Sequence, residues 1–224
     1  MAQRDAGATG DEPAGAGPAA WGELMDVYTA IRTRRDIEAF AEACPPREVI
    51  ERIIEAAVWA PNHRMTEPWR FHVVAGARRE AMCDAVAAWL SANGGTEGAE
   101  RSMRGKIMRA PLTIIVSQAA SASAPGGAGS AGGGVGADGD ATRELEDYAA
   151  CAAAIQNLLL AAHEEGLIAH FSTDRMIAYD GTRAYLGLRP GDRVVAMVNV
   201  GYLREGVERK TGARSAPIVT WDWR

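Results

Sequence analysis

Hydrophobic residues recur along most of the chain at intervals of three and four, the spacing that places them on one face of a helix. One such segment runs from Glu23 to Arg35, and another runs from the Pro45-Pro46 pair to the residue before Pro61. The same spacing predicts further helices over residues 78–91, 97–109, 144–165 and 174–186. Helices are therefore expected to make up most of the regular structure.

Unbroken apolar runs separate some of these helices. Residues 112–116 read Leu-Thr-Ile-Ile-Val and residues 194–200 read Val-Val-Ala-Met-Val-Asn-Val, and such runs predict strands that are buried on both faces. Shorter extended segments are expected at 69–74 and 167–173. Because the strands are few and separated, the predicted class is α+β, with a small mixed central sheet flanked by helices.

Two segments have almost no bulky apolar side chains. Residues 1–20 are rich in Ala, Gly and Pro, and residues 119–140 are nearly all Ala, Gly and Ser with two aspartates. Such compositions cannot bury enough area to become ordered. The remaining chain, with 47% hydrophobic residues over all 224 positions, suffices for one sizeable core. We expect a disordered tail over 1–20 and a single domain over 21–224 with a flexible insertion at 119–140.

Charge and composition exclude several classes of partner. The net charge is −5, and without a clustered basic face no nucleic-acid partner is expected. No apolar run approaches the roughly 18 residues of a membrane span and no apolar leader follows Met1, so we expect a cytoplasmic protein without a membrane partner. The three cysteines, Cys44, Cys83 and Cys151, are widely spaced and odd in number, which is typical of reduced thiols. No Cys/His spacing resembles a zinc site, and no bound metal is expected.

A polar loop between a helix and a strand is the first candidate for chemistry. Residues 60–74 read APNHRMTEPWRFHVV, so the loop lies between an expected helix and an expected strand. Pro61 and Pro68 stiffen it by fixing their own φ and restricting the residue before each. A stiff loop of this kind holds polar side chains at the rim of a core, a suitable place to bind a flat heteroaromatic ligand.

A cationic cluster at the end of the first predicted helix allows two interpretations. Residues 32–36 read Arg-Thr-Arg-Arg-Asp. Cations suit the C-terminal end of a helix dipole, so the cluster on its own is typical of a solvated helix end. A guanidinium fork also matches phosphate geometry, so the cluster is equally a candidate anion site.

Four pieces taken together resemble a known family. They are RTRRDIEAF near the start, APNHRMTEPWRFHVV, the segment AIQNLLLAAHEEGL, and a strand that ends VNVGYL. Their order and separations are similar to those of the nitroreductase family of FMN-dependent oxidoreductases, most closely to its compact, single-domain NAD(P)H nitroreductase subgroup. The resemblance covers about residues 25–221 without the Gly-rich insertion. It implies a nitroreductase-like fold and an intertwined homodimer with two FMN sites across the interface.

The resemblance also implies roles for individual residues. Arg34, Arg35 and Asp36 match the motif that holds the FMN phosphate, ribityl chain and ring edge. His63 and Glu67 match loop positions that contact the flavin, usually from the partner subunit. Glu67 departs from the Gln that is common there, and an ionised carboxylate cannot donate a hydrogen bond to a flavin carbonyl. Glu67 is therefore expected either to bind a ribityl hydroxyl or to point away.

Two further segments enter through the same resemblance. Phe171, Ser172 and Thr173 match the stretch that passes the flavin, and some relatives have Arg where Ser172 stands. The missing cation is expected from the basic C-terminal tail, where Arg214, or alternatively Lys210, is the candidate. This tail has no core-like segment of its own and is expected to pack on another part of the protein or on a second subunit.

The implied activity is the reduction of nitroaromatic, quinone or related conjugated electrophiles. NADPH or NADH passes a hydride to FMN, and an electron-poor acceptor then uses the same place, in a ping-pong cycle that needs no protein nucleophile. One shared open site agrees with the absence of a GxGxxG fingerprint after a strand. No residue of the chain is expected to be catalytic in itself.

Two other interpretations stay open at the level of sequence. The Arg34-Arg35-Asp36 motif and a hydroxyl residue at Thr173 also resemble the flavin-fragmenting enzyme that makes 5,6-dimethylbenzimidazole, although the loop at 61–68 lacks the small Ser-Val-Gly sequence of that enzyme. A flavin-binding module without turnover is the other, with the tail and insertion as interaction segments.

Overall fold

The computed structural model describes residues 25–120, 136–174, 176, 179–209, 212 and 214–222, with residues 136–140 described by their backbone alone. The predicted tail over 1–20 lies outside these residues. The elements in chain order are α1 (Val27–Thr33), α2 (Arg47–Val58), the 3₁₀ turn η1 (His63–Met65), β1 (Trp69–Ala75), α3 (Ala77–Ala92), α4 (Glu97–Ile107), β2 (Leu112–Gln118), α5 (Gly136–Glu164), β3 (Ile168–Ser172), α6 (Asp180–Leu186) and β4 (Arg193–Gly201).

The strands form one sheet in the order β1-β2-β4-β3, and each neighbouring pair is antiparallel. A parallel contribution comes from an isolated bridge between Asp36 and Ala169, so the expected mixed character is confined to that bridge. The predicted α+β class is confirmed. Every residue of β2 is buried, as its unbroken apolar run predicts.

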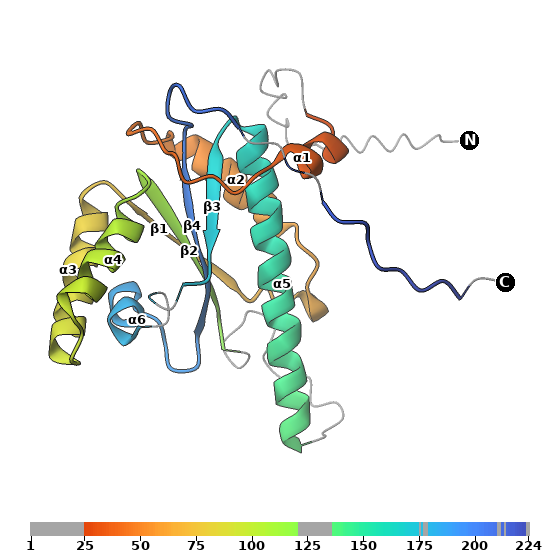
Figure 1. Cartoon of the computed structure of the whole chain (residues 1–224). Helices are drawn as coiled ribbons and strands as arrows, with labels where there is room; N and C mark the ends of the chain where they lie inside the picture. The colour runs from red at the N-terminus through yellow and green to blue at the C-terminus, as the bar shows by residue number, and fades with distance from the viewer. Residues whose placement is uncertain are drawn as a thin grey trace, which may run out of the picture.

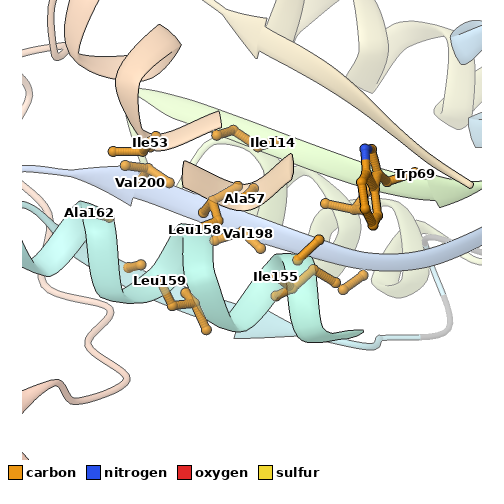
Figure 2. Packing of buried hydrophobic residues seen from close by; sticks show 14 of the residues in the cluster. Ile53, Ala57, Trp69, Ile114, Ile155, Leu158, Leu159, Ala162, Val198 and Val200 are labelled. Carbon is orange, nitrogen blue, oxygen red and sulfur yellow. The ribbon is translucent and has the colours of Figure 1, made fainter. Parts of the chain in front are cut away.

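Helices cover both faces of the sheet (Figure 1). On one face α2 and α5 pack on the sheet through a core that includes Ile53, Leu158 and Val198 (Figure 2). On the other face a second core joins α3 and α4 to the sheet around Met82 and Ile115. Because side chains alternate along a strand, Ile114 and Ile115 of β2 enter different cores. The sheet is therefore the middle layer of three.

Several boundaries differ from the predicted ones. The helix α1 ends at Thr33, so Arg34 and Arg35 lie beyond it. The predicted insertion at 119–140 is bounded differently, because Ala119 is buried and donates its N–H to the Pro68 carbonyl across 2.7 Å, and α5 already begins at Gly136. Residues 121–135 lie outside the described part of the chain. In the part that is described, no helix is both long and apolar enough to cross a bilayer.

Candidate functional site

The segment that follows α1 is bound along the edge strand β3. Its backbone forms the bridge to Ala169, whose carbonyl accepts a hydrogen bond from the Ile37 N–H at 3.1 Å. The carboxylate of Asp36 accepts a hydrogen bond from the Phe171 N–H on Oδ1 and one from Nδ1 of His170 on Oδ2, each across 2.7 Å. Burial pushes the pKa of Asp36 upward, yet these bonds and the charges of His170 and Arg34 outweigh it and leave the pKa lowered. Asp36 is thus an ionised anchor for its segment.

A pocket of about 300 Å³ opens between this segment, β3 and α5. Arg34, Asp36 and Phe171 line it from one side, and the α5 side is lined by Tyr148, Ala152, Ile155, Gln156 and Leu159. Most of the α5 wall is apolar, while the opposite wall carries charge. Such a pocket suits a ligand with a flat apolar body and an anionic end.

Positive charge is concentrated beside this pocket. Nε of Arg34 is buried and has no hydrogen-bond partner among the described residues. Arg209 donates from Nη1 to Nδ1 of His163 across 2.7 Å, and Nε2 of His163 lies 2.8 Å from the Thr33 hydroxyl. The pKa of His163 is lowered, first by burial and then by Arg209 and Arg34, with Arg35 adding to them against Glu164. Arg34, Arg35 and Arg209 make the electrostatic potential here positive. This potential disfavours the protonated form of His163 and favours the binding of an anion.

Arg209 is the residue that sequence reasoning missed. The tail was expected to supply Arg214 or Lys210. Arg214 is exposed and Lys210 lies outside the described residues, so that expectation stays a prediction. Arg209 is instead fixed on the buried His163 and by a second bond, from Nη2 to the Gly166 carbonyl at 3.1 Å. The sequence shows only that Arg209 belongs to the basic tail. Its contact with His163 could not be predicted, because the two residues are 46 positions apart.

Arg35 differs from its neighbour Arg34 in the partners of its guanidinium group. Its Nη1 donates to the carbonyls of Arg32 and Arg34 at 2.6 and 2.8 Å, and its Nη2 donates to the Gly212 carbonyl at 3.0 Å. These bonds direct the guanidinium to the backbone and tie the tail to the end of α1. Arg35 also lines a second pocket, of about 500 Å³, together with Val207 and Gly212.

The polar loop is held in an unusual backbone conformation. Arg64 and Met65 each have φ of 53° and Glu67 has φ of 42°, a left-handed region that costs non-glycine residues about 1 kcal/mol or more each. Side-chain bonds hold the loop there. The Asn62 Oδ1 accepts from the Glu67 N–H at 3.1 Å, and the His63 ring lies 2.7 Å from Glu146. The loop is therefore tied to the N-terminal half of α5.

The pocket that Arg34 lines includes neither His63 nor Glu67. His63 contacts Glu146, whereas Arg34 lies in the arginine cluster around His163, beside the C-terminal end of α5 where α1 lies in Figure 1. At 1.5 Å per residue, Glu146 and His163 are about 25 Å apart along the helix.

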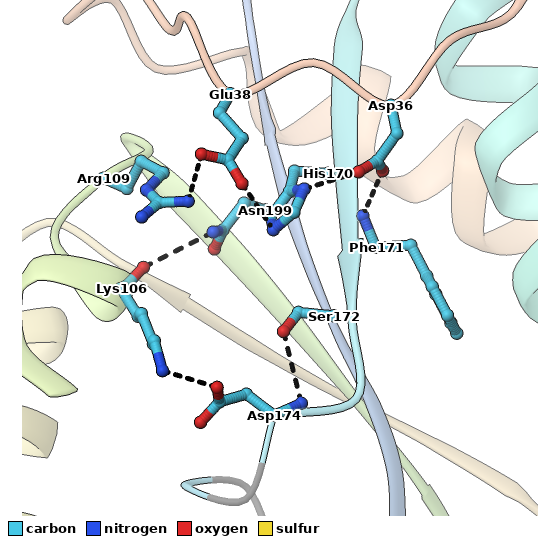
Figure 3. Close-up of polar contacts among 9 residues, drawn as sticks. All are labelled: Asp36, Glu38, Lys106, Arg109, His170, Phe171, Ser172, Asp174 and Asn199. Carbon is cyan, nitrogen blue, oxygen red and sulfur yellow. Dashed lines mark hydrogen bonds and ion pairs between the residues drawn. The ribbon is translucent and has the colours of Figure 1, made fainter. Parts of the chain in front are cut away.

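The last predicted segment is divided between two faces of β3. Phe171 points to the α5 side, while His170 and Ser172 point to the opposite side (Figure 3). Ser172 lines a third pocket, of about 290 Å³, and its hydroxyl accepts from the Asp174 N–H at 3.3 Å. Thr173 is exposed. Among the described residues no three His, Cys, Asp or Glu side chains are grouped as ligands of one metal ion.

Comparison with known proteins identifies the family. The model described as "Nitroreductase family" matches residues 31–202. YfhC of Bacillus subtilis, named as a candidate NAD(P)H nitroreductase, is 29% identical over 184 residues, which are 80% of this chain and 86% of YfhC. A nitroreductase-like family protein from Bacillus cereus superposes with a TM-score of 0.67 at 26% identity, covering 88% of this chain and 95% of that one. A candidate nitroreductase from Desulfovibrio desulfuricans in complex with FMN gives a TM-score of 0.58 at 27% identity, covering 86% and 92%. The chain belongs to the nitroreductase family.

Proposed function

We propose that the protein is a homodimeric, FMN-dependent NAD(P)H oxidoreductase that reduces nitroaromatic, quinone or related conjugated electrophiles. The family membership supports an oxidoreductase. The FMN complex of the Desulfovibrio desulfuricans relative supports the cofactor, and the name of YfhC supports a nicotinamide donor, NADPH or NADH.

The observation that carries the proposal is the unbalanced positive charge beside an apolar pocket. Arg34 lines that pocket and has a buried N–H for which the described part of the chain offers no acceptor. Arg209 contacts Nδ1 of His163, the ring nitrogen opposite the one beside Thr33. A phosphate accepts hydrogen bonds from several donors and its charge is stabilised by the same field. Arg34 and Arg209 would hold the FMN phosphate, and Asp36 would keep the segment in place.

The pocket walls suit the ring of FMN. Tyr148, Leu159 and Phe171 present apolar surface to a flat ligand, and Phe171 is partly exposed, at 40%. Bound there, FMN would supply hydride acceptance and donation, which are not available from side chains. The residues bind and orient the ring and exclude water from one face of it.

Nucleophilic catalysis by either buried cysteine is disfavoured. Burial, with Asp147 nearby, raises the pKa of Cys151 to about 12, and burial also raises the pKa of Cys83. Both thiols stay protonated at neutral pH and are weak nucleophiles. This agrees with a cycle in which donor and acceptor occupy one open site in turn and no covalent bond to the protein forms.

The proposed homodimer has two lines of support. His63 and Glu67 do not line the pocket that Arg34 lines, which agrees with their contacting the flavin from a second copy. Apolar side chains also stay exposed on α1 and on the C-terminal tail: Val27, Tyr28, Ile31, Ile218, Val219 and Trp221. Burying such a surface against a partner is favourable by about 25 cal/mol per Å².

The test is anaerobic reduction of the purified, FMN-loaded protein. Addition of NADPH or NADH should bleach the flavin absorbance, and a quinone or nitrofuran should restore it with steady turnover. Protein that stays colourless after incubation with FMN, or flavin that neither nicotinamide bleaches, would overturn the proposal.

No contact in the described residues favours the flavin-fragmenting or non-catalytic alternatives. Turnover with an acceptor would exclude a non-catalytic module, and benzimidazole among the aerobic products would point to fragmentation.

A further inference from the structure

His170 of β3 is held between two carboxylates of the segment that follows α1. Its Nδ1 lies 2.7 Å from Oδ2 of Asp36 and its Nε2 lies 3.2 Å from Oε1 of Glu38 (Figure 3). The His170 side chain is only 17% exposed, while those of Asp36 and Glu38 are about half exposed. The ring thus bridges two residues of one loop from a fixed position on the sheet.

Both ring nitrogens face acceptors, which defines the protonation state that fits. A neutral imidazole has one N–H and one lone pair, so one of the two carboxylates would meet a lone pair. The imidazolium donates to both. The pKa of His170 is raised, mainly by the hydrogen bond to Asp36 and by the charges of Asp36 and Glu38, against burial and Arg109.

The other charged groups around the ring are already paired with one another. Arg109 forms an ion pair with Glu38, and Lys106 lies 2.5 Å from Asp174 in the same pocket. Asp36 also feels Arg34. Arg109 and Lys106 thus match Glu38 and Asp174 in charge. Asp36 is left with His170 and Arg34 as its cationic neighbours, so an uncharged His170 removes one of the two.

The bridge lies close in sequence to Arg34. Asp36 is two residues from Arg34, and it contacts β3 through His170 and through the Phe171 N–H. Arg34 lines the pocket on the α5 side of β3, while His170 lies on the other side of the strand. A change at His170 can reach Arg34 only through the backbone that Asp36 anchors.

We propose that His170, as an imidazolium that donates to Asp36 and Glu38, is a positioning residue that holds residues 34–38 against β3 and thereby sets the affinity of the neighbouring pocket for the anionic end of FMN. This inference rests on the proposed function. His170 does not touch the ligand. Its charge makes the affinity pH-dependent, falling as the pH rises from about 6.5, the ordinary histidine value, through the raised pKa of His170.

Two amide variants separate the contacts with Asp36 and Glu38 from the charge of His170. In His170→Asn the side-chain NH₂ stands near the place of Nδ1 and can still donate to Asp36, without titrating. In His170→Gln the NH₂ stands near the place of Nε2 and can reach Glu38 alone. His72→Gln is the matched control, because His72 lies on the opposite edge strand β1 and its Nε2 contacts the Ser117 hydroxyl at 2.9 Å.

The measurement is the dissociation constant for FMN, from quenching of flavin fluorescence at pH 7 to 9. That range lies above the second ionisation of a phosphate monoester, near pH 6. For the wild type and His72→Gln we expect the affinity to fall by up to about tenfold as His170, whose pKa is raised above its ordinary value, loses its proton. His170→Asn should bind with little dependence on pH, and His170→Gln should bind about tenfold more weakly than the wild type at pH 7 and also with little dependence on pH.

Each outcome decides between the two proposals. If the wild type binds FMN and both His170 variants keep its pH profile, the role of His170 is wrong and the proposed function stands. If the wild type does not bind FMN at any pH, the proposed function fails. The thermal unfolding midpoints of the flavin-free wild type and His170→Asn then test whether His170 holds residues 34–38 against β3. The wild type should lose stability relative to the variant as the pH rises from about 6.5 through the raised pKa of His170, and parallel curves overturn the inference. Circular dichroism of both variants establishes that they are folded.

Discussion

Thr66 and Asp147 form a buried hydrogen bond in which Oγ1 of Thr66 donates to Oδ1 of Asp147 across 2.8 Å. Both residues are almost wholly buried. The bond joins the polar loop to α5 at the point where three neighbouring residues have positive φ. A strained backbone persists only where its surroundings fix it, so this bond is expected to carry much of the stability of the loop.

Replacing Thr66 by Val keeps the shape of the side chain and removes its donor. Asp147 then loses a hydrogen bond in a buried place, which costs about 1–3 kcal/mol. We expect Thr66→Val to lower the free energy of unfolding by that amount, measured by urea denaturation. Ser102→Ala, an exposed change on α4, should stay within about 0.5 kcal/mol. Equal stability of the two variants would show that the bond does not hold the loop.

Replacing Arg34 by Gln tests the anion site directly. Loss of a charge-assisted hydrogen bond costs about 1.5–3 kcal/mol, or roughly 10- to 100-fold in affinity. We expect the variant to bind FMN that much more weakly while its affinity for riboflavin, which lacks the phosphate, changes little. Arg101→Gln, an exposed change on α4, is the matched control and should leave both affinities intact. Equal losses for FMN and riboflavin would place Arg34 at the ring instead of the phosphate.

The elements of the core were predictable because their signals are local. The unbroken run at 112–116 and the proline pair before α2 each define an element through its neighbours in sequence, and β2 and α2 lie where these signals place them. The end of α1 was less predictable. Arg34 and Arg35 continue a helical composition, but Asp36 pairs with β3, and this tertiary contact ends the helix.

The site was only partly predictable for the same reason. Residues 34–36 were found as a motif, but nothing near them in sequence indicates that Arg35 binds backbone carbonyls while Arg34 keeps a buried free N–H. His163 and His170 lie on predicted elements and gave no signal at all. Their contacts with Arg209 and Asp36 span 46 and 134 positions, and such pairs emerge only from the fold.

We expect the buried His163 to make the free energy of unfolding depend on pH. Its lowered pKa means that the unfolded chain takes up a proton at a higher pH than the folded protein does. The free energy of unfolding therefore falls as the pH decreases from about 6.5, the ordinary histidine value, through the lowered pKa. His163→Asn keeps an acceptor near the place of Nδ1 for Arg209 and does not titrate.

The expected result is a flatter decline in the unfolding midpoint of His163→Asn than of the wild type between pH 7 and 5. Contributions from His170 and the carboxylates are common to both proteins, so the difference between the two curves isolates His163. Curves that stay parallel over this range would mean that the pKa of His163 is not lowered in the folded protein.

We expect exposed apolar side chains of the C-terminal tail to stabilise a dimer. Residues 214–222 run away from the sheet (Figure 1), and Ile218 is fully exposed while Val219 is half exposed. Burying two such side chains against a partner contributes about 1.5–3 kcal/mol each. Sedimentation equilibrium of the wild type should give twice the chain mass of 23.7 kDa. The double variant Ile218→Asp and Val219→Asp should raise the dimer dissociation constant by about 100-fold or more.

The control for added charge lies earlier in the same tail. Ser215 is also exposed but polar, so Ser215→Asp puts a carboxylate into the tail without removing apolar surface and should leave the dimer intact. If the site is shared between subunits, dissociation of the double variant should also weaken FMN binding, because His63 and Glu67 of one copy are then lost to Arg34 of the other. A monomeric double variant with unchanged FMN affinity would place the whole flavin site within one chain.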